Sequence, residues 1–136
     1  MDFMKSLFVA ASGLKAQSGR MRVIAENIAN ADSTARTPNA DPYRRKIPTF
    51  EAIYDSKMQA NRVEIGRIET DRSEFNLRFN PSHPAANADG FVKMPNVDRL
   101  VEAVDMREAQ RSYEANLNVI SSTRTMLART LEILRA

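Results

Sequence analysis

The first thirty residues carry apolar side chains at steps of three and four positions. This spacing is typical of one apolar stripe on an α-helix and predicts a helix over residues 3–30. Gly13 and Gly19 weaken this helix by about 1 kcal/mol each relative to alanine. We therefore expect this helix to be ordered by packing rather than by its own propensity.

The last forty residues return to helical spacing and contain neither glycine nor proline after Asn96. Asn96 is a candidate N-cap for a helix over residues 97–135. Two apolar stripes run along it on nearly opposite sides. A helix of this length spans about 60 Å at 1.5 Å per residue, whereas a compact domain of this size has a radius of gyration of roughly 14 Å. The sequence therefore predicts an elongated molecule.

The middle of the chain, residues 31–96, holds all six prolines. Alternating apolar and polar residues predict half-buried strands at 62–69 and 74–79, and a third short strand lies around Phe91. We interpret this region as a small β-rich insert, a hairpin with one further strand.

These elements predict a mainly α, elongated fold. Long N- and C-terminal helices pair as a coiled coil, with a small β-rich insert between them. The expected divisions are residues 1–32 and 97–136 for the two terminal helices, and residues 33–96 for the loop and insert.

Apolar stripes on an elongated chain normally meet partners, so the sequence predicts a part of an assembly. The expected assembly seam consists of Phe3, Leu7, Leu14, Met21, Ile24, Ile28, Tyr113, Leu117, Ile120, Leu127, Leu131 and Leu134. The expected second-face and register contacts are Asn27, Asn30, Val101, Val104, Asn116, Asn118, Val119, Met126 and Ile133.

A helical wheel places Asn27 and Asn30 on the side away from Ile24 and Ile28, near Val9 and Val23. One interpretation is that these amides fix the register of an interface, because an unpaired amide costs about 1–3 kcal/mol. The other interpretation is that they cap a fraying helix end.

Composition and charge exclude several functional classes. The chain of 136 residues has a net charge of +3, 43% hydrophobic residues and no cysteine. These values exclude disulfides and argue against a disordered chain or a strong nucleic-acid footprint. No apolar run reaches 18 residues, so no membrane insertion is expected. His83 is the only histidine, and no cluster has metal-ligand spacing, so we expect no enzyme, metal or cofactor.

The sharpest basic cluster is Tyr43, Arg44, Arg45 and Lys46. Tyrosine beside arginine can stack on bases, so a nucleic-acid patch is one interpretation. Acidic residues flank the cluster and weaken its field, so structural or interchain pairing is the preferred interpretation.

The segment "SGLKAQSGRMRVIAENIANADST" (12–34) resembles the N-terminal signature of the flagellar rod, hook and hook-filament axial proteins. The segment "EAQRSYEANLNVISSTRTMLARTLEIL" (108–134) is similar to their C-terminal signature. The segments "PYRRKIPTFE" (42–51) and "DGFVKMPNVDRLVEAVDM" (89–106) resemble a short rod member of that family.

The resemblance implies a structural subunit of the proximal rod of the bacterial flagellar basal body. Its terminal helices would assemble with copies of itself and other axial proteins into a helical tube that crosses the periplasm and transmits torque for motility. It also implies export by the flagellar type III apparatus without a cleaved signal peptide. A secretory signal in "KSLFVAASGLKA" (5–16) is the alternative.

Two other functional hypotheses stay open at this point. One is a coiled-coil adaptor or scaffold that forms a closed oligomer through the same stripes. The other is an architectural nucleic-acid binder that uses Arg44, Arg45 and Lys46.

Overall fold

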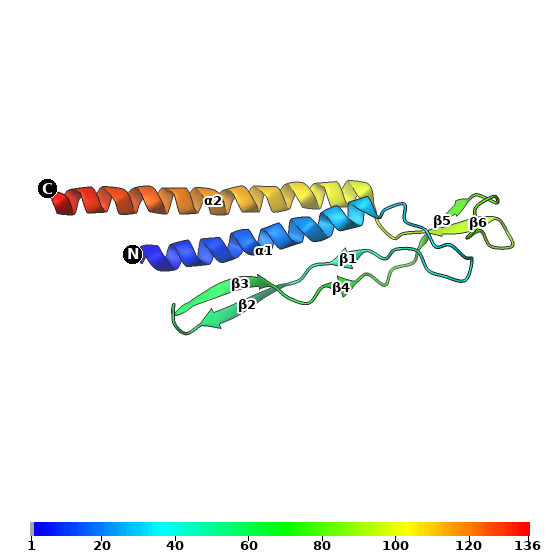
Figure 1. Ribbon diagram of the computed structural model, residues 1–136, viewed down its shortest axis with the longest axis horizontal. Coiled ribbons are helices and arrows are strands. Elements are labelled where there is room, and N and C mark those ends of the chain that lie inside the picture. Colours follow the sequence, from blue (N-terminus) through cyan, green and yellow to red (C-terminus); the bar gives the residue numbers. More distant parts are fainter. Residues whose placement is uncertain (1) are drawn as a thin grey trace. The chain divides into compact units, whose positions relative to one another are not determined.

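The computed structural model describes residues 2–136 and contains two long helices and several short strands (Figure 1). Helix α1 spans Phe3–Ala29 and helix α2 spans Arg99–Arg135. The strands are β1 (Lys46–Ile47), β2 (Phe50–Asp55), β3 (Ala60–Ile65), β4 (Glu69–Thr70), β5 (Asn76–Phe79) and β6 (Phe91–Met94).

Both predicted helices are confirmed, but the predicted N-cap of the second one is wrong. Asp98, not Asn96, caps α2, because its Oδ1 atom accepts the backbone N–H groups of Leu100 at 2.9 Å and Val101 at 3.4 Å. The helix therefore begins at Arg99 and runs for 37 residues.

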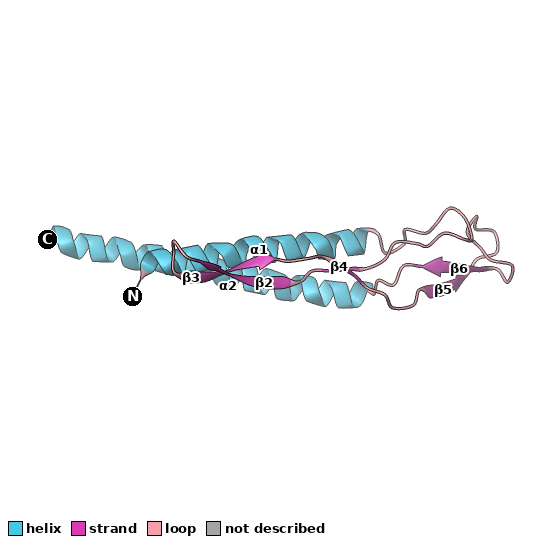
Figure 2. Ribbon diagram, turned by 90° about the horizontal axis from the view of Figure 1, so that it is seen from below, coloured by secondary structure: helices cyan, strands magenta, loops and turns pink. Residues whose placement is uncertain are grey.

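The strands form two-stranded antiparallel ribbons, coloured magenta in Figure 2. Strand β2 pairs with β3, β1 with β4, and β5 with β6. The predicted hairpin with one further strand is therefore wrong. The sequence interpretation missed β2, in which Phe50, Ala52 and Tyr54 face one side and Glu51, Ile53 and Asp55 face the other.

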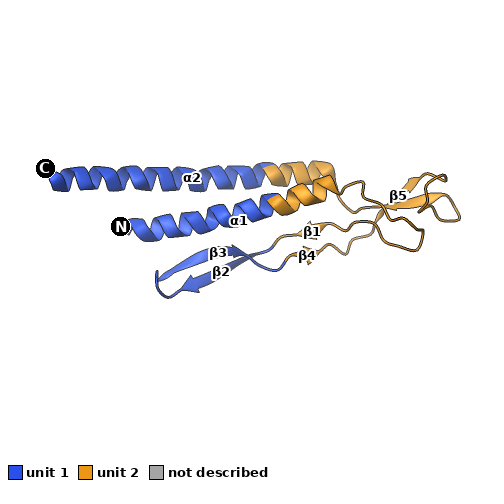
Figure 3. Ribbon diagram, in the orientation of Figure 1, with its two compact units in different colours: residues 1–21, 49–67, 107–136 blue, residues 22–48, 68–106 orange. Residues whose placement is uncertain are grey.

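The chain divides into two compact units, which are coloured separately in Figure 3. Unit 1 comprises residues 1–21, 49–67 and 107–136, and unit 2 comprises residues 22–48 and 68–106. Each unit therefore contains part of both helices and part of the strands.

In unit 1, α1 contacts α2 with one face and β3 with another. A Cβ atom added to Gly13 would lie 2.8 Å from the side-chain amide of Asn116 in α2. A Cβ atom added to Gly19 would lie 2.4 Å from Cδ1 of Ile65 in β3. The two glycines that weaken α1 as an isolated helix therefore allow its neighbours to approach closely.

The free edge of β3 is also held by α1. The hydroxyl of Ser12 accepts the backbone N–H of Val63 at 3.1 Å. On the other face of α1, Arg20 pairs with Glu108 of α2 at 3.4 Å. With Gly13 beside Asn116, this pair shows that the two helices run antiparallel in unit 1.

In unit 2, the β5–β6 ribbon is covered only at β6. Val92 is buried, whereas Leu77 and Phe79 are 63% and 64% exposed. A strand within the predicted range 74–79 is confirmed as β5, but it is exposed along its whole length, so the predicted half-burial is wrong. The Phe79 and Phe91 rings pack edge to face, with centroids 5.4 Å apart.

The expected elongated shape, the coiled-coil pairing of the helices and the divisions 1–32, 33–96 and 97–136 stay predictions. Within residues 2–136, neither helix has a segment long and apolar enough to cross a membrane.

Gly90 provides a test of the β5–β6 ribbon, because it has a φ of +84° and lies against Phe79 and Pro81. We expect Gly90→Ala to destabilise the protein by at least about 1–2 kcal/mol, since a Cβ atom is strained in this conformation. Urea unfolding followed by circular dichroism measures the change. The control is Ala88→Gly at an exposed position of the same loop, and an equal loss in both variants would contradict the interpretation.

Candidate assembly site

A buried polar cluster lies in unit 2 and consists of Asn27, Arg45 and Glu102. Glu102 is 0% exposed and Asn27 is 1% exposed, and both are among the largest fully buried side chains of the described chain. Arg45 reaches them from the segment that precedes β1 and keeps a side-chain exposure of 22%. The cluster thus joins the end of α1, the start of α2 and the insert.

The Asn27 amide uses its full hydrogen-bonding capacity. Its Nδ2 atom donates to the Lys46 carbonyl at 2.8 Å and to Oε2 of Glu102 at 3.3 Å. Its Oδ1 atom accepts from the Lys46 N–H at 2.9 Å and from the Tyr43 hydroxyl at 2.8 Å. The side chain therefore pairs with the backbone of Lys46 as a neighbouring strand would. Only the amide of Asn or Gln offers two N–H donors together with an oxygen that accepts two hydrogen bonds.

The carboxylate of Glu102 is satisfied at both oxygens. Oε2 accepts from Asn27, and Oε1 accepts from Nε of Arg45. The Arg45 guanidinium also lies 3.7 Å from Asp71 and 3.5 Å from Asp105. A buried carboxylate requires such pairing, because an isolated charge in this position would be prohibitively costly.

Asn96 fixes the segment that carries Arg45. Its Oδ1 atom accepts the Arg45 N–H at 2.8 Å, and its Nδ2 atom donates to the carbonyls of Asp71 at 3.1 Å and Ser73 at 3.3 Å. Asn96, which was expected to cap the helix, therefore joins the insert segment at Arg45 to the segment at 71–73.

The surroundings of the cluster shift three pKa values. Burial, with the negative charges of Glu26 and Glu102, raises the pKa of Tyr43 to about 12. Burial lowers the pKa of Arg45, but the hydrogen bond and charge of Glu102 outweigh it and leave this pKa above its ordinary value. Hydrogen bonds from Ser73 and the charge of Arg45 hold the pKa of Asp71 below its ordinary value.

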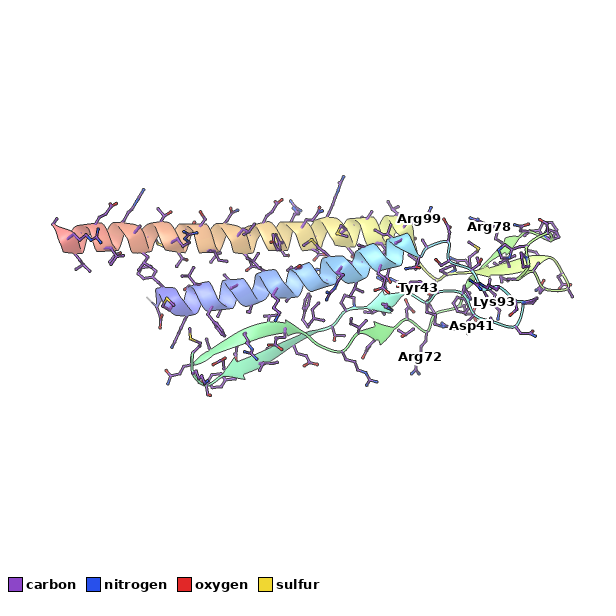
Figure 4. The ribbon with its side chains drawn as sticks, in the orientation of Figure 1. Asp41, Tyr43, Arg72, Arg78, Lys93 and Arg99 are labelled. Carbon is purple, nitrogen blue, oxygen red and sulfur yellow. The ribbon has the colours of Figure 1, made fainter. Side chains whose placement is uncertain are left out.

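All four residues of the predicted basic cluster have partners within unit 2. Tyr43, labelled in Figure 4, donates to Asn27 of the buried polar cluster, Arg45 belongs to that cluster, and Lys46 pairs with Glu26. The Arg44 guanidinium lies 4.1 Å from the centroid of the Phe75 ring. Three of these side chains hold the insert to α1 and α2, whereas Arg44 packs within the insert.

The predicted seam residues fall into three groups. Ile24 is buried, and the half-buried members are Phe3, Leu7, Leu14, Met21, Ile28, Tyr113, Ile120 and Leu127. The exposed members are Leu117, Leu131 and Leu134.

The predicted second-face residues are mostly exposed. Asn27 is buried, and Asn30 and Asn116 are half-buried. The exposed members are Val101, Val104, Asn118, Val119, Met126 and Ile133.

The expected position of Asn27 is only partly right. Asn27 lies on the side of Val23 as expected, but it is buried together with Ile24 rather than on the side away from Ile24. Its bonds join α1 to the insert and to α2, so it does not cap a fraying end. Asn30 does bond locally, since its Nδ2 atom donates to the Glu26 carbonyl at 2.9 Å.

The sequence interpretation named Asn116 but missed the other three members of a line of buried or half-buried residues along α2. Glu102, Ala109, Asn116 and Thr123 recur every seven residues, and all but half-buried Asn116 are buried. A search for apolar residues could not find this line, because its members are small or polar. The seven-residue spacing was the available signal.

The described residues contain no group of three or more side chains suited to hold a metal ion. A shallow groove on α2 in unit 1 is lined by Leu117, Ile120, Ser121, Arg124, Thr125 and Ala128. Such an open, mixed surface suits contact with another protein better than binding of a small molecule.

Comparison with known proteins identifies the family. Two family models match, one described as "Flagella basal body rod protein" over residues 7–36 and one as "Flagellar basal body rod FlgEFG protein C-terminal" over residues 88–133. The chain is 51% identical to the flagellar basal-body rod protein FlgC of Agrobacterium fabrum, over 94% of this chain and 92% of the relative. The chain belongs to the FlgC family of flagellar basal-body rod proteins.

More distant FlgC relatives also cover nearly the whole chain. Identity to FlgC of Bacillus subtilis is 43% over 98% of this chain and 99% of that protein. Identity to FlgC of Salmonella typhimurium is 38% over 92% of both. The chain is therefore a structural, non-enzymatic rod subunit of the flagellar basal body.

Removing Glu102 tests the energetic role of the buried polar cluster. We expect Glu102→Ala to destabilise the protein by about 3 kcal/mol, because Arg45 and Asn27 would lose a buried partner. Urea unfolding measures the loss. The control is Glu108→Ala, which removes an exposed partner of Arg20 and should cost less than about 1 kcal/mol; similar losses in both variants would refute the assignment.

Tyr43 provides a pH test of the same region. Its pKa is raised from 10.0 to about 12, so the folded state holds the phenol proton more tightly than the unfolded state. This contribution to stability is complete below pH 10.0 and is lost as the pH rises through about 12. We expect the alkaline loss to be smaller in Tyr43→Phe.

Denaturation curves between about pH 9 and pH 12 would measure this difference, and ultraviolet absorbance would follow phenol ionisation. An unchanged alkaline profile in Tyr43→Phe would show that Tyr43 does not contribute to it.

Proposed function

We propose that this chain is a subunit of the proximal rod that assembles through its terminal helices with copies of itself and other rod proteins. The product is a helical tube that crosses the periplasm and transmits torque for motility. The paired helices form its core, and the insert is carried beside them. Family membership supports this proposal, and the exposed apolar residues of α2 give it a physical basis.

The exposed apolar side chains of α2 are the main physical support for assembly. Leu131 is 51% exposed, and Ile133 and Leu134 are each 76% exposed, although water disfavours such side chains. Several of them lie along one helix in unit 1, which is typical of a surface that another protein covers. In unit 1 these residues are Leu117, Val119, Met126, Leu131, Ile133 and Leu134.

The end of α2 also extends past the start of α1 in unit 1. Leu127 lines a groove with Phe3 and Met4 of the first turn of α1. The antiparallel arrangement leaves the last turns of α2 without a facing turn among the described residues of α1. This supports the view that α2 is completed by a neighbouring subunit.

We further propose that the flagellar type III apparatus exports the chain without a cleaved signal peptide. The segment 5–16, which has the outline of a secretory signal, lies inside α1 and contributes buried Ala10 and Ala16. Its part in the folded helix supports retention in the mature protein.

The assembly role is tested by Leu117→Asp. Leu117 is 43% exposed, so we expect the isolated chain to fold while an unpaired carboxylate at the interface weakens assembly on the order of tenfold or more. Swimming of a strain that carries only this variant, with isolation of its basal bodies, provides the measurement. The control is Ser122→Asp, which adds the same charge at an exposed polar position on a different face of α2.

The remaining hypotheses make different predictions. Normal rods built from Leu117→Asp subunits would refute the role of this face. A discrete closed oligomer of the purified chain, measured by analytical ultracentrifugation, would favour the adaptor hypothesis. Salt-sensitive binding to duplex DNA would favour the nucleic-acid hypothesis.

A further inference from the structure

The start of α2 buries a carboxylate where its sequence offers apolar side chains. In unit 2, Glu102 is 0% exposed, whereas Leu100, Val101 and Val104 are 74%, 48% and 59% exposed. Hydrophobic burial alone would rotate or slide the helix until the valines faced inward. Another interaction must therefore determine which residues of α2 face α1.

The buried polar cluster of Asn27, Arg45 and Glu102 provides that interaction. Both Glu102 oxygens and all four hydrogen-bonding positions of Asn27 are used. Sliding α2 by one turn would move Glu102 by about 5.4 Å and leave these groups without partners. The wrong alignment is therefore penalised by buried polar groups that have lost their partners.

We propose that the buried polar cluster selects one register and one rotation of α2 against α1. Its role is conformational specificity, as a single buried polar residue can set the register of paired helices. This inference is independent of the proposed assembly, because it concerns the isolated chain. The consequence of this register is that Val101 and Val104 of α2 face outward in unit 2.

The test measures the helix register directly. The chain contains no cysteine, so spin labels can be attached to Arg22→Cys on α1 and Leu100→Cys on α2. Both positions are exposed and lie in unit 2. Pulsed electron paramagnetic resonance then reports the distance between the labels in the full chain.

We expect one narrow distance in the labelled parent chain. Replacing the cluster with apolar residues, Asn27→Leu/Arg45→Met/Glu102→Leu, should add a second population displaced by up to about one turn, or 5.4 Å. A single unchanged distance in this triple variant would overturn the proposal. The control variant Asp32→Ala/Arg99→Ala removes an exposed ion pair of the same unit and should keep one distance.

A second variant tests the role of the buried polar cluster if the triple variant does not fold. Glu102→Ala/Met106→Glu moves the carboxylate one turn along α2. If the cluster selects the register, the relocated carboxylate should bind Asn27 and Arg45 in place of the one removed, and the distance between the labels should lengthen. An unchanged distance, or a chain without a cooperative unfolding transition, would overturn the proposal, because packing or the connection to β6 would then fix the register.

Discussion

The structure depends on a carboxylate that has no access to water. Glu102 is tolerated inside unit 2 because Asn27 and Arg45 satisfy both of its oxygens. Burying a valine gains about 1.5–3 kcal/mol, whereas leaving one partner of a buried ion pair alone costs about 3–5 kcal/mol. The free energy lost by leaving Glu102 unpaired therefore exceeds the free energy gained by burying either Val101 or Val104 by itself. Both valines are accordingly exposed.

The same constraint organises the insert. Asn27 holds the backbone of Lys46 through both its N–H and its carbonyl, so β1 begins at a position fixed by α1. Asn96 holds the Arg45 N–H and the segment after β4 in the same way. Amide side chains thus take the place of further strands beside β1 and β4, which explains how this two-stranded ribbon, marginal by itself, forms part of a defined structure.

Close packing in unit 1 depends on small side chains rather than on buried polar groups. Gly13 and Gly19 leave room for Asn116 and Ile65, and the buried residues around them are small. A rod subunit built in this way uses few large apolar side chains in its own interior. Those that remain on α2, such as Ile133 and Leu134, are exposed and can serve contacts between subunits.

The sequence by itself determined the two helices, because helical periodicity is local, and it determined the family, because the terminal segments are distinctive. It could not determine strand pairing or burial. Leu77 and Phe79 alternate as a buried strand would, yet β5 is exposed, and Asn96 precedes α2 as a cap would, yet it binds Arg45. Glu102 has the pattern of a surface residue until Arg45 and Asn27, distant in sequence, lie beside it. Only the tertiary structure decides such cases, because the free energy of a charge or an amide depends on partners that local patterns do not contain.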